Sequence, residues 1–193
     1  MLALEALSAE LASGDDARAG KAASRFVEYG YAGFDALISL QKSEDADIRW
    51  WAIRALAEFE DSPELTAVLI RGLQDGDAMV RQSAALALMH HPCATAIEPL
   101  ALALADEDSL TASLAANALI GLAGLATGRL LQVLGDGAPR ARVEAARALA
   151  SIKDPQSITG LMKALETESA LLKYWAGIAL ENMGVGMVYF HAR

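Results

Sequence analysis

Three histidines and one cysteine are the residues of this chain that could ligate a transition metal. His90 and His91 are adjacent and are followed by Cys93, whereas His191 lies a hundred residues further on. Adjacent histidines cannot comfortably chelate one ion, and no other Cys or His stands at the spacing of a zinc site. We therefore expect no metal site.

Clustered carboxylates are the second group with possible chemistry. The run Asp106-Glu107-Asp108 would attract a cation, but it lacks the loop pattern of a calcium site. We interpret it as a turn residue, a solvated residue and a helix cap. The sequence has no phosphate loop, nucleophile elbow or dinucleotide-binding fingerprint. It therefore predicts no catalytic residue and no cofactor, and it favours a protein that is not an enzyme.

The charge balance limits the class of partner. The chain of 193 residues has 25 acidic and 16 basic residues, which gives a formal net charge of −9. Phosphate backbones repel such a surface unless its cations cluster, so we expect no nucleic-acid partner. The single cysteine excludes an internal disulfide and fits a reducing compartment. Because residues 1–14 carry no early Lys or Arg, they do not resemble a signal peptide, and we expect a cytoplasmic protein.

One uncharged stretch is long enough to span a bilayer. Residues 109–128 carry no charge. They include several Ser, Thr and Asn residues, however, and Gly121 and Gly124 fall where a helix should end. We interpret the stretch as a buried helix pair and expect no membrane association.

A pattern that returns about every 31 residues positions all of these side chains. Its clearest copy is the segment 75–88, DGDAMVRQSAALAL. An aliphatic–basic pair starts each copy, and the copies are Ile48-Arg49, Val80-Arg81, the degenerate Thr111-Ala112, Ala141-Arg142 and Leu172-Lys173. Alanine follows four residues later and leucine eight later, at Ala52, Ala84, Ala115, Ala145, Ala176, and at Leu56, Leu88, Leu119, Leu149, Leu180. Positions i, i+4 and i+8 share one helical face, so each copy predicts an amphipathic helix.

A second helix precedes each of these. Leucines recur at Leu69, Leu100, Leu130 and Leu161, each with a further leucine four residues later. Helix caps are expected at Asp45, Asp77, Asp108 and Ser169, with Ala138 as the exception. An arginine of the aliphatic–basic pair is expected to bond a turn carboxylate of its own or a neighbouring repeat, which makes it a stacking device. The sequence thus predicts an all-α fold of about six stacked antiparallel helix pairs.

The repeat over residues 31–183 resembles the HEAT repeat, in particular the short bacterial type of phycobilin lyase subunits. The resemblance implies a right-handed α-solenoid whose second helices line the concave side. Residues 1–30 fit the pattern poorly and are expected to form an N-terminal capping pair, with a helix over 1–13, a helix from Asp16 to about 28, and a turn at 29–33. Residues 184–193 are expected to form a C-terminal capping tail or a subunit contact within a single domain over 1–193.

The residues opposite the buried stripe of the second helices are the candidate binding site. A step of 100° per residue places Trp50 and Arg54 on this far side. We call the corresponding positions of all second helices the lane. The candidate binding residues of the lane are Trp50, Arg54, Gln82, Asn117, Arg147 and Tyr174. Aromatic side chains and arginine supply most hot spots of protein interfaces.

Three function classes follow. The first is a scaffold that binds a protein or peptide on the lane without catalysis. The second, implied by the resemblance, is a lyase-like or chaperone-like subunit that handles a tetrapyrrole or its carrier protein. The third is DNA repair, because some alkylpurine DNA glycosylases resemble HEAT arrays. The net charge of −9 and the presence of only two lane arginines argue against the third class. The sequence does not indicate an oligomeric state.

Overall fold

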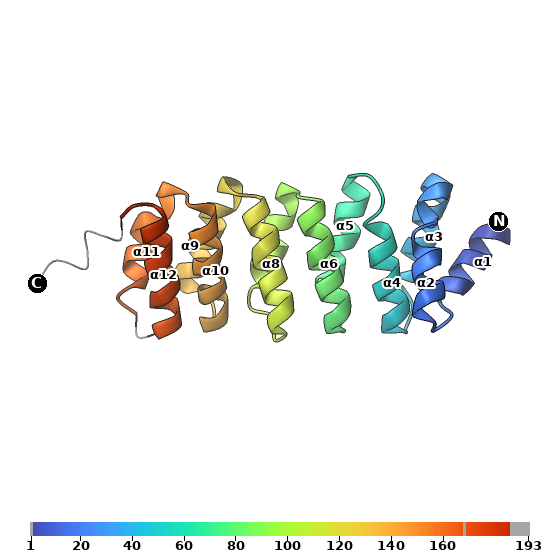
Figure 1. The fold of residues 1–193 in the computed structure, drawn as a ribbon, viewed down its shortest axis with the longest axis horizontal. Helices are drawn as coiled ribbons and strands as arrows, with labels where there is room; N and C mark the ends of the chain where they lie inside the picture. Colours follow the sequence, from blue (N-terminus) through green and yellow to red (C-terminus); the bar gives the residue numbers. More distant parts are fainter. Residues whose placement is uncertain (1, 168, 186–193) are drawn as a thin grey trace, which may run out of the picture. The chain divides into compact units, whose positions relative to one another are not determined.

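The computed structural model describes residues 2–167 and 169–185, and in these ranges the regular secondary structure is helical (Figure 1). The chain divides into two compact units, Met1–His91 and Pro92–Arg193. The described residues form six consecutive helix pairs, three in each unit. This confirms the predicted all-α solenoid class and the predicted number of pairs.

The first unit builds two rows of helices. The helices α1, α3 and α5 form one row, and α2, α4 and α6 form the other, which is nearer the viewer in Figure 1. We call the members of the second row second helices. The elements are α1 (Leu2–Leu11), α2 (Asp16–Ala23), the 3-10 helix η1 (Phe26–Tyr29), α3 (Gly30–Leu40), α4 (Ala46–Leu56), α5 (Pro63–Gly72) and α6 (Ala78–His90).

The second unit repeats this arrangement. The helices α7, α9 and α11 form one row, and the second helices α8, α10 and α12 pack side by side as the other. The elements are η2 (Ala94–Ala96), α7 (Ile97–Ala103), α8 (Ser109–Gly121), α9 (Gly124–Asp136), α10 (Pro139–Ile152), η3 (Pro155–Ser157), α11 (Ile158–Ala164) and α12 (Ala170–Asn182).

The periodic alanines and leucines form the cores. The five alanines of the repeat are fully buried, and the five leucines are at most 2% exposed. Small alanines allow neighbouring helices to approach closely, and the leucines fill the space beside them. The prediction that these positions form the buried face is confirmed.

The helix caps also follow the prediction. The side chains of Asp45, Asp77, Asp108 and Ser169 each accept a hydrogen bond from a backbone N–H in the first turn of α4, α6, α8 and α12. Ala138 makes no such bond, and α10 begins with Pro139 instead, whose missing N–H needs no partner there. These caps fix where each second helix begins, and so they fix the positions of the lane.

The predicted turn at residues 29–33 is wrong. Gly30 adopts a positive φ of 52° and ends η1, but it also begins α3, so residues 31–33 are helical. Gly33 serves close packing, because a Cβ built on it would lie 2.1 Å from the backbone oxygen of Phe26. A second correction concerns the helix predicted from Asp16 to about 28: α2 is capped by Asp15 and ends at Ala23, and η1 follows as a separate 3-10 helix.

The helix α12 ends in a Schellman motif. Gly184 has a φ of 78°, its N–H donates to the carbonyl oxygen of Glu181, and the N–H of Val185 donates to that of Leu180. The tail predicted at 184–193 lies outside the described residues from 186 onward. The uncharged stretch 109–128 forms α8 and the start of α9. No helix in the described ranges has the length and apolarity needed to cross a membrane.

Candidate functional site

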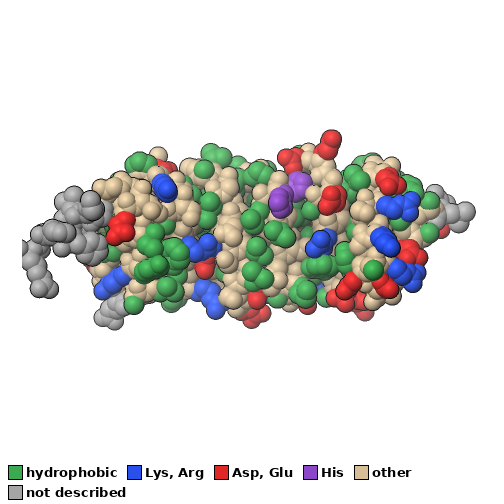
Figure 2. All heavy atoms as spheres, viewed as in Figure 1, with side chains coloured by type: hydrophobic (Ala, Val, Ile, Leu, Met, Phe, Trp, Pro, Cys, Tyr) green, Lys and Arg blue, Asp and Glu red, His purple; other side chains and the backbone are tan. Residues whose placement is uncertain are grey.

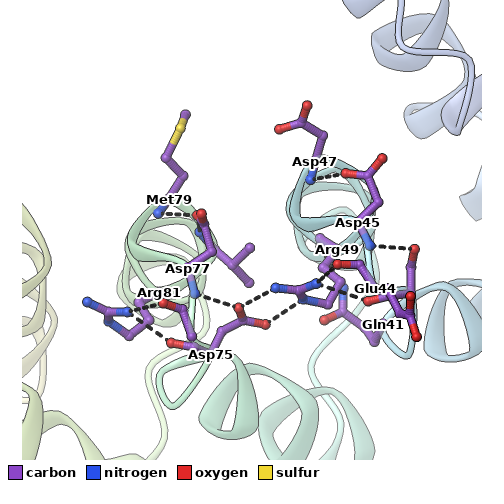
Figure 3. Close-up of polar contacts among 12 residues, drawn as sticks. Gln41, Glu44, Asp45, Asp47, Arg49, Asp75, Asp77, Met79 and Arg81 are labelled. Carbon is purple, nitrogen blue, oxygen red and sulfur yellow. Dashed lines mark hydrogen bonds and ion pairs between the residues drawn. The ribbon is translucent and has the colours of Figure 1, made fainter.

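The arginine of the aliphatic–basic pair joins consecutive repeats. Arg49 on α4 donates from Nε and Nη2 to both carboxylate oxygens of Asp75, at 2.8 and 2.7 Å (Figure 3). Its Nη1 donates to the carbonyl oxygens of Ser43 and Glu44 in its own repeat. The Arg49 hydrogen bonds hold the pKa of Asp75 below its usual value. Both side chains are largely buried, so this pair links the repeats and is not available to a ligand.

Arg140 replaces an arginine that the fourth repeat lacks. Arg49 and Arg81 each donate from Nη1 to the carbonyl oxygens six and five residues before them. In the fourth repeat the corresponding position is Ala112, and the corresponding carbonyls are those of Asp106 and Glu107. Nη1 of Arg140, from the next repeat, donates to both, at 2.9 and 2.7 Å. The loop geometry is therefore retained although its own arginine is absent.

The lane of the first unit centres on a stacked arginine. The guanidinium of the exposed Arg54 lies 4.9 Å from the ring centroid of Trp50 and 5.7 Å from that of Trp51. Trp50 is half-buried beneath it. The ring of Trp51 faces α2, where a Cβ on Gly20 would lie 3.3 Å from it. The cation–π contacts hold the exposed guanidinium close to the two rings.

The lane of the second unit centres on a network of hydrogen bonds. Arg147 on α10 donates to Oδ1 of Asn117 at 3.0 Å, to Oε2 of Glu144 at 2.8 Å and to the backbone oxygen of Ser113 at 3.1 Å. Two predicted binding residues, Asn117 and Arg147, thus bond each other. Glu144 brings a carboxylate that the lane positions alone do not contain. The guanidinium is neutralised and held rigid, so it stabilises the contact between α8 and α10.

The remaining lane residues differ in their exposure. Tyr174 on α12 is 57% exposed and contacts Trp175 edge to face, with ring centroids 5.3 Å apart. Gln82 on α6 is half-buried. Arg54 and Tyr174 are therefore the predicted binding residues with the most accessible surface.

Exposed apolar side chains lie in or beside the lane, and the candidate binding residues do not include them. Met79 and Leu86 on α6, Leu110 on α8 and Leu171 on α12 are 43–56% exposed. Figure 2 shows such hydrophobic side chains on the second helices of each unit. Met79, Leu110 and Leu171 all stand directly before the aliphatic–basic pair or its degenerate copy. An apolar residue at this capped helix start, where water is accessible, is the sequence signal that could have identified them.

The two adjacent histidines have different surroundings. The Nδ1 atom of His91 contacts the carboxylate of Asp61, and its Nε2 atom lies 2.9 Å from the carbonyl oxygen of Ala57. This ring ties the end of α6 to the α4–α5 loop. His90 is exposed and lines a small groove with Arg54, Glu58 and Leu86. The described part of the chain contains no group of three His, Cys, Asp or Glu residues arranged to hold a metal ion.

Comparisons with known proteins agree with this architecture. A family model of HEAT repeats matches residues 34–120 and 127–185. No curated protein sequence gives a significant match. Among solved structures, an engineered protein is 25% identical over 96% of this chain and 98% of its own, with a TM-score of 0.54. The complex of CpcE and CpcF of phycocyanin lyase from Nostoc sp. PCC7120 is 25% identical over 94% of this chain and 77% of that one, with a TM-score of 0.55. A designed armadillo repeat protein in complex with the peptide (KR)4 is 18% identical over 93% and 99%, with a TM-score of 0.52, and shares the fold.

Proposed function

Because the chain belongs to the HEAT-repeat family, we propose that it is a scaffold that binds a protein or peptide on its second helices. The observation that carries this proposal is the exposure of large apolar side chains on α6, α8 and α12. Such side chains gain free energy when a partner removes them from water, at about 25 cal/mol per Å². A cytoplasmic location is part of the proposal, and the single cysteine, which fits a reducing compartment, supports it.

The second helices of the Pro92–Arg193 unit combine the features of an interface. Leu171 and Tyr174 supply exposed anchors on α12, and Leu110 supplies one on α8. Between these helices lies α10, where the Arg147 network keeps the polar groups hydrogen-bonded. A surface whose polar groups are already ordered loses little entropy on binding. Apolar anchors around a satisfied polar centre suit a peptide or a partner helix.

In the Met1–His91 unit the same face combines apolar and cationic groups. Met79 and Leu86 lie on α6, and Arg54 lies on the adjacent α4. This unit also carries fifteen of the 25 acidic residues but only eight of the 16 basic ones. The negative electrostatic field of this unit therefore favours partner segments that are neutral or basic, and it slows the approach of acidic segments.

Combined replacement of Leu171 and Tyr174 by alanine is expected to weaken partner binding about thirtyfold, because the pair together is expected to contribute about 2 kcal/mol of binding free energy. The partner is first captured on the wild-type protein from its native source, and its affinity for each variant is then measured by calorimetry. Leu125→Ala is the matched control, since Leu125 is 70% exposed but lies on α9. Equal affinity of the double variant and the wild type would exclude this face. Arg147→Ala is not diagnostic, because it also breaks the contact with Asn117.

A second candidate function is a subunit that handles a linear tetrapyrrole or its carrier protein. The 25% identity with the phycocyanin lyase complex over 94% of this chain favours it. This function predicts a change in the visible absorbance of a bilin when the protein is added, because binding would order the flexible chromophore. Loss of this change in the Leu171→Ala/Tyr174→Ala variant would indicate the same face. An unchanged spectrum with the wild type would eliminate the candidate.

A further inference from the structure

A pocket of about 520 Å³ opens in the Met1–His91 unit, away from the lane. It lies where the start of α3 meets the loop between α4 and α5. Its lining residues are Val27, Gly30, Tyr31, Phe34, Phe59, Glu60, Ser62 and Glu64. The volume lies within the range of small-molecule sites in proteins, about 300–1,000 Å³.

The walls of this pocket are aromatic. Phe34 and Phe59 contact each other edge to face, with ring centroids 5.4 Å apart, and both remain half-buried. Tyr31 is 82% exposed, more than any other large apolar or aromatic side chain of the described chain. A tyrosine with this exposure adds little to the core, and its ring is available to a ligand. Three aromatic rings beside one cavity provide a surface that attracts a cation.

The charges on this pocket have one sign. Glu60 and Glu64 are exposed carboxylates, and the lining includes no Lys, Arg or His. The nearby Glu28 forms an ion pair with Arg25, whose Nε lies 3.6 Å from the Glu28 carboxylate, so Arg25 compensates the charge of Glu28. The oxygen of Ser62 accepts the N–H of Leu65 as the cap of α5. The two glutamates thus leave the aromatic pocket with an uncompensated negative rim.

We propose that this pocket binds a small organic ammonium ion, with its alkyl groups against the rings and its charge near Glu60 and Glu64. Aromatic faces recognise quaternary ammonium groups through cation–π attraction, and carboxylates stabilise the same charge. A neutral apolar ligand would use the rings but gain nothing from the carboxylates. An anion would be repelled. This site is independent of the second-helix face, so either assignment can fail without the other.

The proposal predicts that the pocket distinguishes charge at constant shape. Choline and 3,3-dimethylbutan-1-ol have nearly the same shape, but only choline is a cation. Titration followed by NMR should give a dissociation constant for choline about tenfold lower than that for the neutral alcohol, with the largest shifts at residues 27–34 and 59–64. Equal affinities would overturn the proposal, as would shifts centred elsewhere.

Variants separate the two parts of the site. Tyr31→Ala should weaken choline binding about tenfold, and because Tyr31 is exposed the fold should not change. Glu60→Gln/Glu64→Gln should weaken choline binding about fivefold and leave the neutral alcohol unaffected. Tyr174→Ala is the matched control, since this exposed tyrosine lies in the other unit. Undiminished binding by Tyr31→Ala would overturn the assignment.

A third arm identifies the source of the cation. A short peptide with blocked ends and a single lysine between alanines presents one ammonium charge on a polypeptide. Weaker binding of this peptide than of choline supports a small-molecule ligand. Tighter binding of the peptide at the same residues would overturn the small-molecule assignment in favour of a basic side chain of a partner.

Discussion

Replacement of Arg49 by alanine is expected to lower the free energy of unfolding of the Met1–His91 unit by about 3 kcal/mol. Such a loss is typical when one partner of a buried ion pair is removed, because the other charge stays buried without compensation. Here Asp75 would lose both side-chain hydrogen bonds from Arg49 and retain the N–H of Asp77 and the weaker attraction of Arg81. Urea unfolding followed by tryptophan fluorescence measures the change, in a Trp175→Phe background where only Trp50 and Trp51, on the same helix as Arg49, emit.

The chain offers a matched control with the same chemistry at the surface. Arg18 bonds both carboxylate oxygens of Glu10, at 2.7 and 2.8 Å, but both side chains are about half exposed. Solvent screens this pair, so Arg18→Ala should cost much less than Arg49→Ala. Equal losses of stability in Arg49→Ala and Arg18→Ala would contradict the proposed role of Arg49 in joining consecutive repeats.

The Arg49 effect should also depend on pH. The Arg49 hydrogen bonds lower the pKa of Asp75 in the folded state, so the unfolded chain binds the proton more readily. The stabilisation is therefore complete above the unfolded pKa, about 3.9, and is lost as the pH falls through the folded value. The stability difference between wild type and Arg49→Ala should shrink below about pH 4. A difference that stayed constant with pH would contradict the role of Asp75.

Replacement of Gly33 by alanine is expected to destabilise the same unit by about 3 kcal/mol, the upper end for overpacking. The new Cβ would lie 2.1 Å from the backbone oxygen of Phe26, and backbone cannot move aside as a flexible side chain can. Either η1 or α3 must shift. Because Val27, Tyr31 and Phe34 stand on these two elements, the ammonium pocket should lose affinity as well. Thermal unfolding and choline titration measure the two effects.

Gly128 provides the control of opposite sign. It also lies within a helix, α9, but nothing stands within 4 Å of a Cβ placed on it. Gly128→Ala should therefore stabilise the protein by about 0.5–1 kcal/mol, since alanine restricts the unfolded chain and favours the helix. Destabilisation of both variants to the same extent would mean that the Gly33 contact is not the cause.

The periodic part of the fold could be predicted because it depends on spacing alone. An alanine and a leucine at i+4 and i+8 from each pair must share a helical face, and every such position is buried. The caps at Asp45 and Asp77 follow from the same register. Periodicity also defines the lane, since Trp50 and Tyr174 stand at equivalent positions of their repeats.

Periodicity could not predict which polar side chains would bond each other across helices. Arg147 and Asn117 stand at equivalent lane positions 30 residues apart, and this spacing is what brings them into contact. The composition of the lane suggested an interface, but the same arginine satisfies its donors within the unit. Leu171 was missed because the lane was defined by two positions of each repeat, and Leu171 stands on the same helical face one turn before the first of them.

The pocket could not be predicted for a different reason. It forms where the repeat pattern is weakest, around η1, and its residues come from positions 27–34 and 59–64, which share no register. In the sequence, Gly30 and Gly33 do not show whether they form a turn or allow close packing inside a helix. Gly30 reverses the chain as a turn glycine does, whereas Gly33 lies inside a helix and permits a close approach.

The contact of Arg140 with the carbonyls of Asp106 and Glu107 limits how this array can be rebuilt. Repeats that contain all the side chains needed for their own turns can be duplicated or exchanged one at a time. Here the repeat that contains Ala112 has no such arginine of its own, and Arg140 of the following repeat donates in its place. A standard repeat inserted between the two, without an arginine at the position of Arg140, would leave those oxygens without their donor. A protein engineer lengthening this chain must therefore move the two repeats together, as one inseparable module.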